Sequence, residues 1–408
     1  MAGSKPRAVL MAHGLRQIFC GIGANPQGLG RLATGPTRFA VVMDVTNIGG
    51  AEIQMLEIFR HFDPAVVVPR LVCLREGGPM ADEFRAAGFD VDVLDRSGRY
   101  DWRTIPRLVR NLRHHRTEAV LVLHFHRAAL VLGLLAASVA RVRLRIVAIR
   151  NMDLTRVGRR CLPRYVVHTL FLTNVMVLQA PSQGRYLHEE EGVGRYPWSR
   201  IKEVVIPNGI PIPELSTVLD RERVRAILGL DVDDVVVGIA ARLCEQKAHH
   251  VLIESIARLA SDHPRLRLVV VGEGPREAEL RALVERRNIS ERVLFTGVRR
   301  DVPSLLPGFD ISCLSSLHEG TPVFVIESMA AGLPVVVTDC GALRDMITDS
   351  REGFLVPVGD VASLADRIGR LASSPELRAQ QGTLGRKRAE RDYRIELTTK
   401  RFEALLNG

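Results

Sequence analysis

Two glutamates stand eight residues apart around a predicted helix start, in Glu319-Gly320-Thr321-Pro322 and further on at Glu327. Thr321 suits the N-cap, and Pro322 suits the first helical position, where a missing N–H costs nothing. Free N–H groups at a helix N-terminus beside a glycine attract anions. The pattern therefore predicts an anion site between two carboxylates. The alternative, on these residues alone, is an ordinary crossover whose glutamates face solvent.

Two cations and a glycine pair offer further groups that could bind a ligand. Arg242 and Lys247 follow a predicted strand, where they could neutralise a diphosphate leaving group. Gly49 and Gly50 follow the first predicted strand, where exposed backbone N–H groups can approach a ligand. The structural alternatives are a solvated pair of cations and a tight strand–helix turn.

His124 and His126 are predicted at the carboxyl end of a strand, the edge at which parallel sheets bind ligands. We expect His124 to be structural. A zinc site needs further ligands, which the neighbouring sequence lacks. Two Asp-Val-Asp triplets, at 90–92 and 231–233, are interpreted as solvent-facing carboxylates rather than metal ligands. No metal or other cofactor is expected.

The rest of the chain predicts a framework of alternating strands and helices, which is typical of parallel, doubly wound sheets. The predicted helices include 102–115, 128–139 and 395–406. The predicted strands are 39–45, 66–74, 91–94, 119–125, 144–149, 176–179 and 204–206, then 235–241, 266–271, 293–296, 311–314, 334–338 and 354–356. A chain of 408 residues exceeds a single core.

The segment 206–213 contains three prolines and a glycine, so it is the predicted domain boundary. We predict a basic, disordered extension over residues 1–38, a first domain over 39–207 and a second over 208–391. The C-terminal helix, 392–408, is expected to complete the first domain.

Charge is divided unevenly between the two halves. Residues 1–207 carry +12, and since the total is +10, residues 208–408 carry −2. A basic first half predicts contact with anionic lipid or an acidic acceptor, and arginine-rich solvated helix faces are the alternative. Aromatic residues make up only 5% of the chain and do not alternate with the arginines, which argues against nucleic acid.

Several classes of protein are excluded or disfavoured. No apolar run can span a bilayer, because the best candidate, 128–140, is about seven residues short. The six cysteines are scattered, which indicates a reducing compartment. Gly272-Glu273-Gly274-Pro275 follows a strand but lacks the third glycine of a dinucleotide fingerprint, which argues against hydride transfer to NAD. No G-x-x-x-x-G-K phosphate loop is present, which argues against an ATPase.

In order and spacing, the motifs resemble those of GT-B glycosyltransferases of the retaining family 4, over roughly residues 39–408. The resemblance implies two Rossmann-like domains that face a central cleft. The motifs are Gly49-Gly50-Ala51-Glu52, His126, Ile206-Pro207-Asn208-Gly209, Arg242-Leu243 with Lys247, Gly272-Glu273-Gly274-Pro275, Phe295-Thr296-Gly297, and 319–327 with Ala330, Gly332 and Pro334.

The resemblance also implies roles for individual residues. Arg242 and Lys247 would bind the diphosphate, Glu319 the sugar hydroxyls and Glu327 the ribose, while His126 would line the reaction centre. The implied catalytic residues are His126, Glu319, Arg242 and Lys247. The implied donor-binding residues are Gly49, Gly50, Arg242, Lys247, Gly272, Gly274, Glu319, Gly320, Thr321, Pro322, Val323 and Glu327.

Three positions depart from the family pattern. Ala248 replaces the usual glycine after the lysine and is expected to tighten the turn. Ser328 replaces an alanine, and Asp345 stands where the family has a glutamate, so we do not assign it to the site.

We expect a retaining glycosyltransferase that moves a sugar from a nucleotide-diphosphate sugar to a lipid-linked or polysaccharide acceptor, in cell-envelope or exopolysaccharide synthesis. It would be cytoplasmic and peripheral on the inner face of the cytoplasmic membrane. A GT-B nucleotide-sugar epimerase and a non-catalytic partner subunit are the alternatives.

Overall fold

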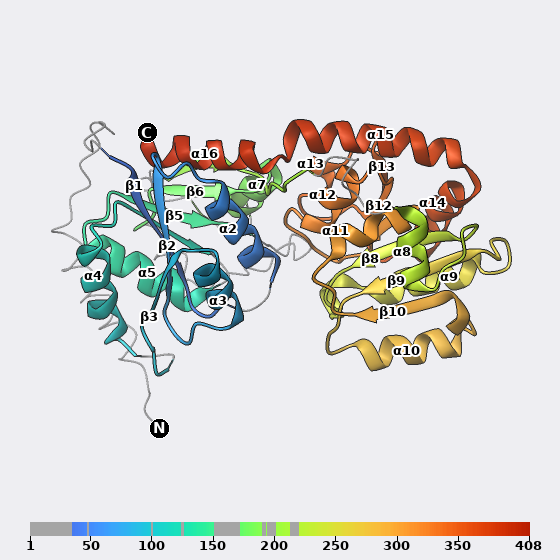
Figure 1. The fold of residues 1–408 in the computed structure, drawn as a ribbon, viewed down its shortest axis with the longest axis horizontal. Helices are drawn as coiled ribbons and strands as arrows, with labels where there is room; N and C mark the ends of the chain where they lie inside the picture. The colour runs from blue at the N-terminus through green and yellow to red at the C-terminus, as the bar shows by residue number, and fades with distance from the viewer. Residues whose placement is uncertain are drawn as a thin grey trace, which may run out of the picture.

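The computed structural model describes residues 35–46, 49–98, 101–123, 126–150, 172–189, 193, 201–212 and 220–408. Within these ranges the chain forms two parallel sheets, each covered by helices on both faces (Figure 1). All thirteen strands predicted from the sequence are present, so the α/β fold class is confirmed. Residues 1–34 of the predicted basic extension lie outside the described ranges.

The first sheet has seven strands in the order β3-β2-β1-β4-β5-β6-β7. Its strands are β1 (Thr37–Met43), β2 (Val67–Cys73), β3 (Asp90–Val93), β4 (Ala119–Leu123), β5 (Leu144–Ala148), β6 (Val175–Leu178) and β7 (Lys202–Val205). Its helices are α2 (Gly50–His61), α3 (Pro79–Ala86), α4 (Thr104–His114), α5 (Arg127–Val139) and α7 (Pro181–Glu189).

Strand β1 shows why this sheet is covered on both faces. Phe39 and Val41 pack into the core that includes residues of α2 and α3. Ala40 and Val42 point the other way, into the core that includes residues of α4 and α5. Because successive strand residues point to opposite faces, a continuous apolar run requires a layer of helices on each side.

The second sheet has six strands in the order β10-β9-β8-β11-β12-β13. These are β8 (Val235–Ala240), β9 (Leu266–Val271), β10 (Val293–Gly297), β11 (Ile311–Leu314), β12 (Val335–Thr338) and β13 (Gly353–Val356). Its helices are α8 (Arg221–Leu228), α9 (His249–Leu259), α10 (Glu277–Arg286), α11 (Val302–Leu305), α12 (Val323–Ala330), α13 (Leu343–Met346), α14 (Val361–Ser373) and α15 (Pro375–Asp392), while the last helix, α16 (Ile395–Asn407), packs on the first sheet. Short 3₁₀ turns η3 (Glu245–Lys247), η4 (Ser290–Arg292) and η5 (Leu306–Gly308) complete the second half.

Both sheets reverse their strand order at one place, between β1 and β4 and between β8 and β11. Open parallel sheets bind ligands at the carboxyl edge beside such a reversal. The loops after β1, β4, β8 and β11 therefore lie where a ligand is expected to bind.

The chain crosses between the sheets twice. Helix α15 runs along the second sheet and α16 returns to the first, where Phe402 joins the core (Figure 1). The two crossings lie side by side, because Ile210 N–H donates to Tyr393 O at 2.8 Å and Ile395 N–H donates to Ile210 O at 2.9 Å. In the described part of the chain no helix is long and apolar enough to cross a bilayer.

Candidate active site

The loop from β11 to α12 lies at the centre of the site, and its helix starts one residue later than predicted. Helix α12 begins at Val323, and Pro322 is its N-cap with extended backbone angles. The prediction that Thr321 is the N-cap is therefore wrong. Thr321 is buried, and its backbone rather than its side chain makes the hydrogen bonds that hold this loop.

The far end of α12 agrees with the sequence prediction. Gly332 has a left-handed φ of 75°, and its N–H donates to Met329 O at 3.0 Å. Such a glycine just beyond the helix is a common termination signal. Glu327 is the fifth residue of this helix, a little over one turn from its start rather than two turns.

The structure brings Lys247 and Glu319 together. Lys247 Nζ lies 2.5 Å from Glu319 Oε1, and Ser316 Oγ donates to the same oxygen at 2.5 Å. The Glu319 side chain is only 6% exposed and the Lys247 side chain 19%. A charge-assisted hydrogen bond in such surroundings is much stronger than one in water.

Neighbouring strands explain this contact. β8 and β11 pair directly, so the loops after them meet at one edge. Leu317 N–H donates to Gln246 O at 2.7 Å, and Gln246 Nε2 donates to His318 O at 2.8 Å. These bonds hold the turn that carries Lys247 against the loop that carries Glu319.

Arg242 follows the same strand as Lys247, but its side chain is exposed. Among the described residues it has no side-chain hydrogen bond or ion pair. Gly272 and Gly274 position its loop: a Cβ at either would collide with the backbone of residues 241–243. Leu243 N–H donates to Glu273 O at 2.9 Å across this close approach.

Glu327 sits in a desolvated position on α12. Removal of its carboxylate from water raises the pKa of Glu327 to about 7. A carboxyl group that titrates near neutrality is common at functional sites and uncommon on a solvated helix face.

On the first sheet, His126 caps the start of α5 and follows β4, which ends at Leu123. The predicted end of this strand, residues 124 and 125 with His124, lies outside the described residues. His126 Nδ1 accepts the Asp44 N–H at 3.0 Å, so Nδ1 carries no proton and the neutral ring is protonated at Nε2. Gly49 and Gly50 are the N-cap and first residue of α2.

The sequence assigned Glu52 no role beyond its place in the Gly49-Gly50-Ala51-Glu52 motif, whereas the structure places it beside His126. It is 7% exposed, and its Oε1 lies 3.6 Å from His126 Nε2. Its position in the first turn of α2 is the sequence signal that could have identified it.

The predicted aspartate triplets do not form a metal site in the described ranges, where no group of three or more His, Cys, Asp or Glu side chains could hold a metal ion. Asp92 was expected to face solvent, but it pairs with Arg70 and accepts from Asn111 Nδ2 at 3.0 Å. Asp233 pairs with Arg265 at 2.5 Å.

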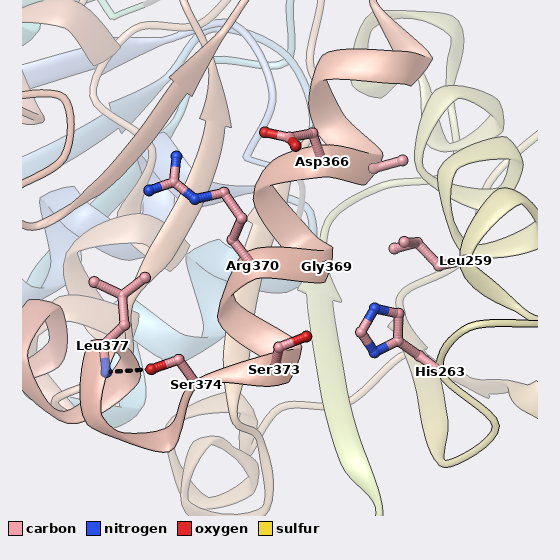
Figure 2. Close-up of a pocket in the computed structure, with 9 residues that line it drawn as sticks. Leu259, His263, Asp366, Gly369, Arg370, Ser373, Ser374 and Leu377 are labelled. Atoms are coloured by element: carbon pink, nitrogen blue, oxygen red, sulfur yellow. Dashed lines mark hydrogen bonds between the residues drawn. The ribbon is translucent and has the colours of Figure 1, made fainter.

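A separate hollow of about 530 Å³ lies between α9, α14 and the start of α15 (Figure 2). Leu259, His263, Asp366, Arg370 and Ser373 are among the residues that line it. None of the site residues predicted from the sequence lies there.

Comparison with known proteins finds a family match for part of the chain. Residues 220–388 match the family described as glycosyl transferases group 1. EpsD of Bacillus subtilis (strain 168) is 38% identical over 173 residues, which are 42% of this chain and 45% of EpsD.

Residues 220–388 of the chain therefore resemble the group 1 glycosyltransferases.

Two further proteins resemble this chain. The lipopolysaccharide core biosynthesis mannosyltransferase LpsB of Rhizobium meliloti (strain 1021) is 26% identical over 212 residues, which are 50% of this chain and 60% of LpsB. The EpsD and LpsB matches thus span about half of each relative. The crystal structure of Anabaena Alr3699/HepE in complex with UDP-glucose superposes with a TM-score of 0.77 at 20% identity, over 90% of this chain and 99% of that one.

The match to HepE shows that the chain has the GT-B fold. The family match over 220–388 includes Arg242, Lys247, Glu319 and Glu327. The residues of the first sheet, such as His126 and Glu52, lie outside that match.

Proposed function

We propose that this protein is a retaining glycosyltransferase that uses a nucleotide-diphosphate sugar as donor. The observation that carries this proposal is the ion pair of half-buried Lys247 and buried Glu319 beside the N-terminus of α12, with Glu327 one turn into that helix. A cation, a helix N-terminus and two carboxylates match the successive phosphate and hydroxyl groups of such a donor. HepE, a protein of the same fold, is described in complex with UDP-glucose.

Each of these groups has a part in donor binding. Lys247 and the exposed Arg242 would bind the diphosphate, and Glu319 would accept hydroxyl protons of the sugar. Because Lys247 touches Glu319, sugar and diphosphate would be adjacent, as they are in the donor. Glu327 would bind the ribose. The loops of Gly49-Gly50, Gly272, Gly274 and Gly320 to Val323 would line the rest.

In the reaction, the bond from the anomeric carbon to the diphosphate oxygen breaks, and the acceptor oxygen forms a new bond on the same face. The acceptor hydroxyl gives its proton to the departing phosphate. Positive groups around the diphosphate stabilise the charge that develops there. His126, neutral and protonated at Nε2, would donate a hydrogen bond rather than accept a proton.

The acceptor would bind to the first half, residues 39–207 completed by 392–408, while residues 208–391 would hold the donor. A lipid-linked or polysaccharide acceptor fits the basic charge of the first half. LpsB, by name a lipopolysaccharide core enzyme, supports this acceptor class. We place the protein in the cytoplasm, at the inner face of the cytoplasmic membrane.

The test is release of nucleoside diphosphate from a panel of nucleotide sugars, with and without membrane lipid. Lys247→Ala and Glu327→Ala should each lose at least about 99% of transfer, because each removes a charged contact to the donor. Lys400→Ala, on an exposed position of α16, is the matched lysine control and should retain activity. Near-normal turnover in both site variants would refute the assignment.

The same panel separates the alternatives. A nucleotide-sugar epimerase would convert the donor without any acceptor, and a non-catalytic subunit would bind UDP but release none from UDP-sugars. Binding to anionic vesicles should weaken as salt rises, since screening reduces the attraction. Absence of vesicle binding at low salt would contradict the peripheral membrane assignment.

A further inference from the structure

Two carboxamide side chains that follow strands of the first sheet, Gln179 and Asn208, hydrogen-bond to the backbone of Thr321, two residues after Glu319. Asn208 lies one residue past the predicted boundary at 207 but belongs to the first half in the structure. We call this pair of hydrogen bonds the clasp. Asn208 Nδ2 donates to Thr321 O at 2.7 Å, and Gln179 Oε1 accepts the Thr321 N–H at 3.2 Å. Asn208, Gln179 and Thr321 are 6%, 3% and 4% exposed. The only two backbone hydrogen-bonding groups of Thr321 are thus both satisfied from the opposite sheet.

Further hydrogen bonds within the first half fix the side chains of Asn208 and Gln179. Gln179 Nε2 donates to Asn208 Oδ1 at 2.7 Å, and Arg150 Nη1 donates to the same oxygen at 2.6 Å. The Gln179 N–H in turn donates to Gln183 Oε1 at 2.7 Å. Arg150, Gln179 and Asn208 follow β5, β6 and β7, which are adjacent strands, so one sheet edge presents all three.

The loop that carries Glu319 is shaped to accept this clasp. A Cβ at Gly320 would collide with the Arg150 carbonyl oxygen and with Gln179 Oε1. Glycine at this position therefore permits the two halves to meet. On its other side the loop is held by the contacts of Glu319 with Lys247 and Ser316.

Two other described contacts between the halves lie away from this loop. Ser182 N–H donates to Asp345 Oδ2 at 3.2 Å, next to α13. Arg300 and Glu83 form an exposed ion pair at 3.3 Å. Of the described contacts between the halves, those of Asn208 and Gln179 act directly on the backbone beside Glu319.

We propose that Asn208 and Gln179 are positioning residues: they order the loop that carries Glu319 only when the two halves meet. Closure of the cleft and alignment of Glu319 are then one event. When the halves separate, Thr321 loses both hydrogen bonds and the loop is free to move. The catalytic consequence rests on the proposed function, whereas the ordering of the loop does not.

The variants follow from the geometry. Asn208→Asp keeps the oxygen that accepts from Arg150 and Gln179, but it places a second oxygen against Thr321 O, so it breaks only the contact between the halves. Gln179→Met has a similar length and removes the acceptor for the Thr321 N–H. Arg300→Gln removes a contact between the halves that does not touch the loop, and it is the matched control.

The first measurement is hydrogen–deuterium exchange of the peptide 317–325 in nucleotide-free protein. Exchange should be at least about fivefold faster in both variants, the factor expected for one lost hydrogen bond, and unchanged in Arg300→Gln. Exchange within about twofold of wild type in both variants would overturn the clasp.

The second measurement compares UDP binding with turnover of whichever UDP-sugar the wild type uses. Since UDP can bind to the second half alone, its Kd should change less than about threefold while kcat falls about tenfold. A purely structural contact would not separate these constants. Faster exchange with unchanged kcat would overturn the positioning role. If the wild type turns over no nucleotide sugar, the proposed function and the catalytic consequence both fall, and exchange still decides the clasp.

Discussion

Replacing Glu327 with glutamine should stabilise the unliganded protein at alkaline pH and much less at acidic pH. Burial raises the pKa of Glu327 from 4.5 to about 7, because the carboxylate loses water and gains no compensating charge. An amide of the same shape carries no charge to desolvate. The variant should therefore lack the energetic cost that the wild type carries when Glu327 is ionised.

The sign follows from proton binding. Between pH 4.5 and about 7 the folded protein binds a proton at Glu327 that the unfolded chain has released, so stability falls as pH rises through this window. At about 1.4 kcal/mol per pH unit, the full cost is about 3 kcal/mol above pH 8 and about 1 kcal/mol at pH 5. The stability difference between variant and wild type should thus grow by about 2 kcal/mol from pH 5 to pH 8.

Urea unfolding of both proteins at several pH values measures this difference. Glu396→Gln makes the same acid-to-amide change on an exposed position of α16, and it should show little dependence on pH relative to wild type. A Glu327→Gln difference that stays constant from pH 5 to pH 8 would refute the reasoning. If Glu327 also binds the donor ribose, the stabilised variant should have lost affinity for UDP.

Three further substitutions test other parts of the site and fold. Lys247→Ala should lower the free energy of unfolding in urea by about 2 to 3 kcal/mol, because buried Glu319 loses its counter-ion. Adding Glu319→Gln should restore stability but not transfer. No stability change in the single variant would contradict the pairing. Ala248→Gly should raise the free energy of unfolding by about 0.5 to 1 kcal/mol, since Ala248 has a left-handed φ of 44° that glycine adopts without strain. A drop in the thermal midpoint of the variant would argue against backbone strain at this position. Asp310→Asn should lower the free energy of unfolding by about 3 kcal/mol, because Asp310 accepts a hydrogen bond from buried Arg225 at 2.7 Å. UDP binding should stay normal, and weakened UDP binding would contradict this purely structural role.

The secondary structure could be predicted because strands buried on both faces are continuous apolar runs of limited length. The strand Val335–Thr338 is an example, bounded by a proline and followed by polar residues. The ends of elements were predicted less well. Strand β1 stops at Met43, two residues before the predicted end, and the N-cap of α12 is Pro322. These ends depend on which backbone groups find partners in three dimensions, as the backbone of Thr321 does with Asn208 and Gln179.

Ala248, which stands where the family has glycine, leads to one expectation from the sequence and to a different finding in the structure. In the sequence, alanine in place of glycine predicted a tighter turn. In the structure, the position still has the backbone angles that favour glycine, with φ 44° and ψ 42°. The chain keeps that conformation because Ala248 is buried and its carbonyl accepts from Ser315 Oγ at 3.1 Å.

The sequence by itself determined the alternation of strands and helices, the two-sheet fold and the set of side chains that we propose for donor binding, because these depend on residue type and local spacing. Tertiary structure alone decided how those side chains pair. Lys247 meets Glu319 because β8 and β11 are neighbours although 72 residues separate the two. Asn208 and Gln179 reach Thr321 only because the two sheets face each other, and burial, which sets the pKa of Glu327, exists only once the chain has folded.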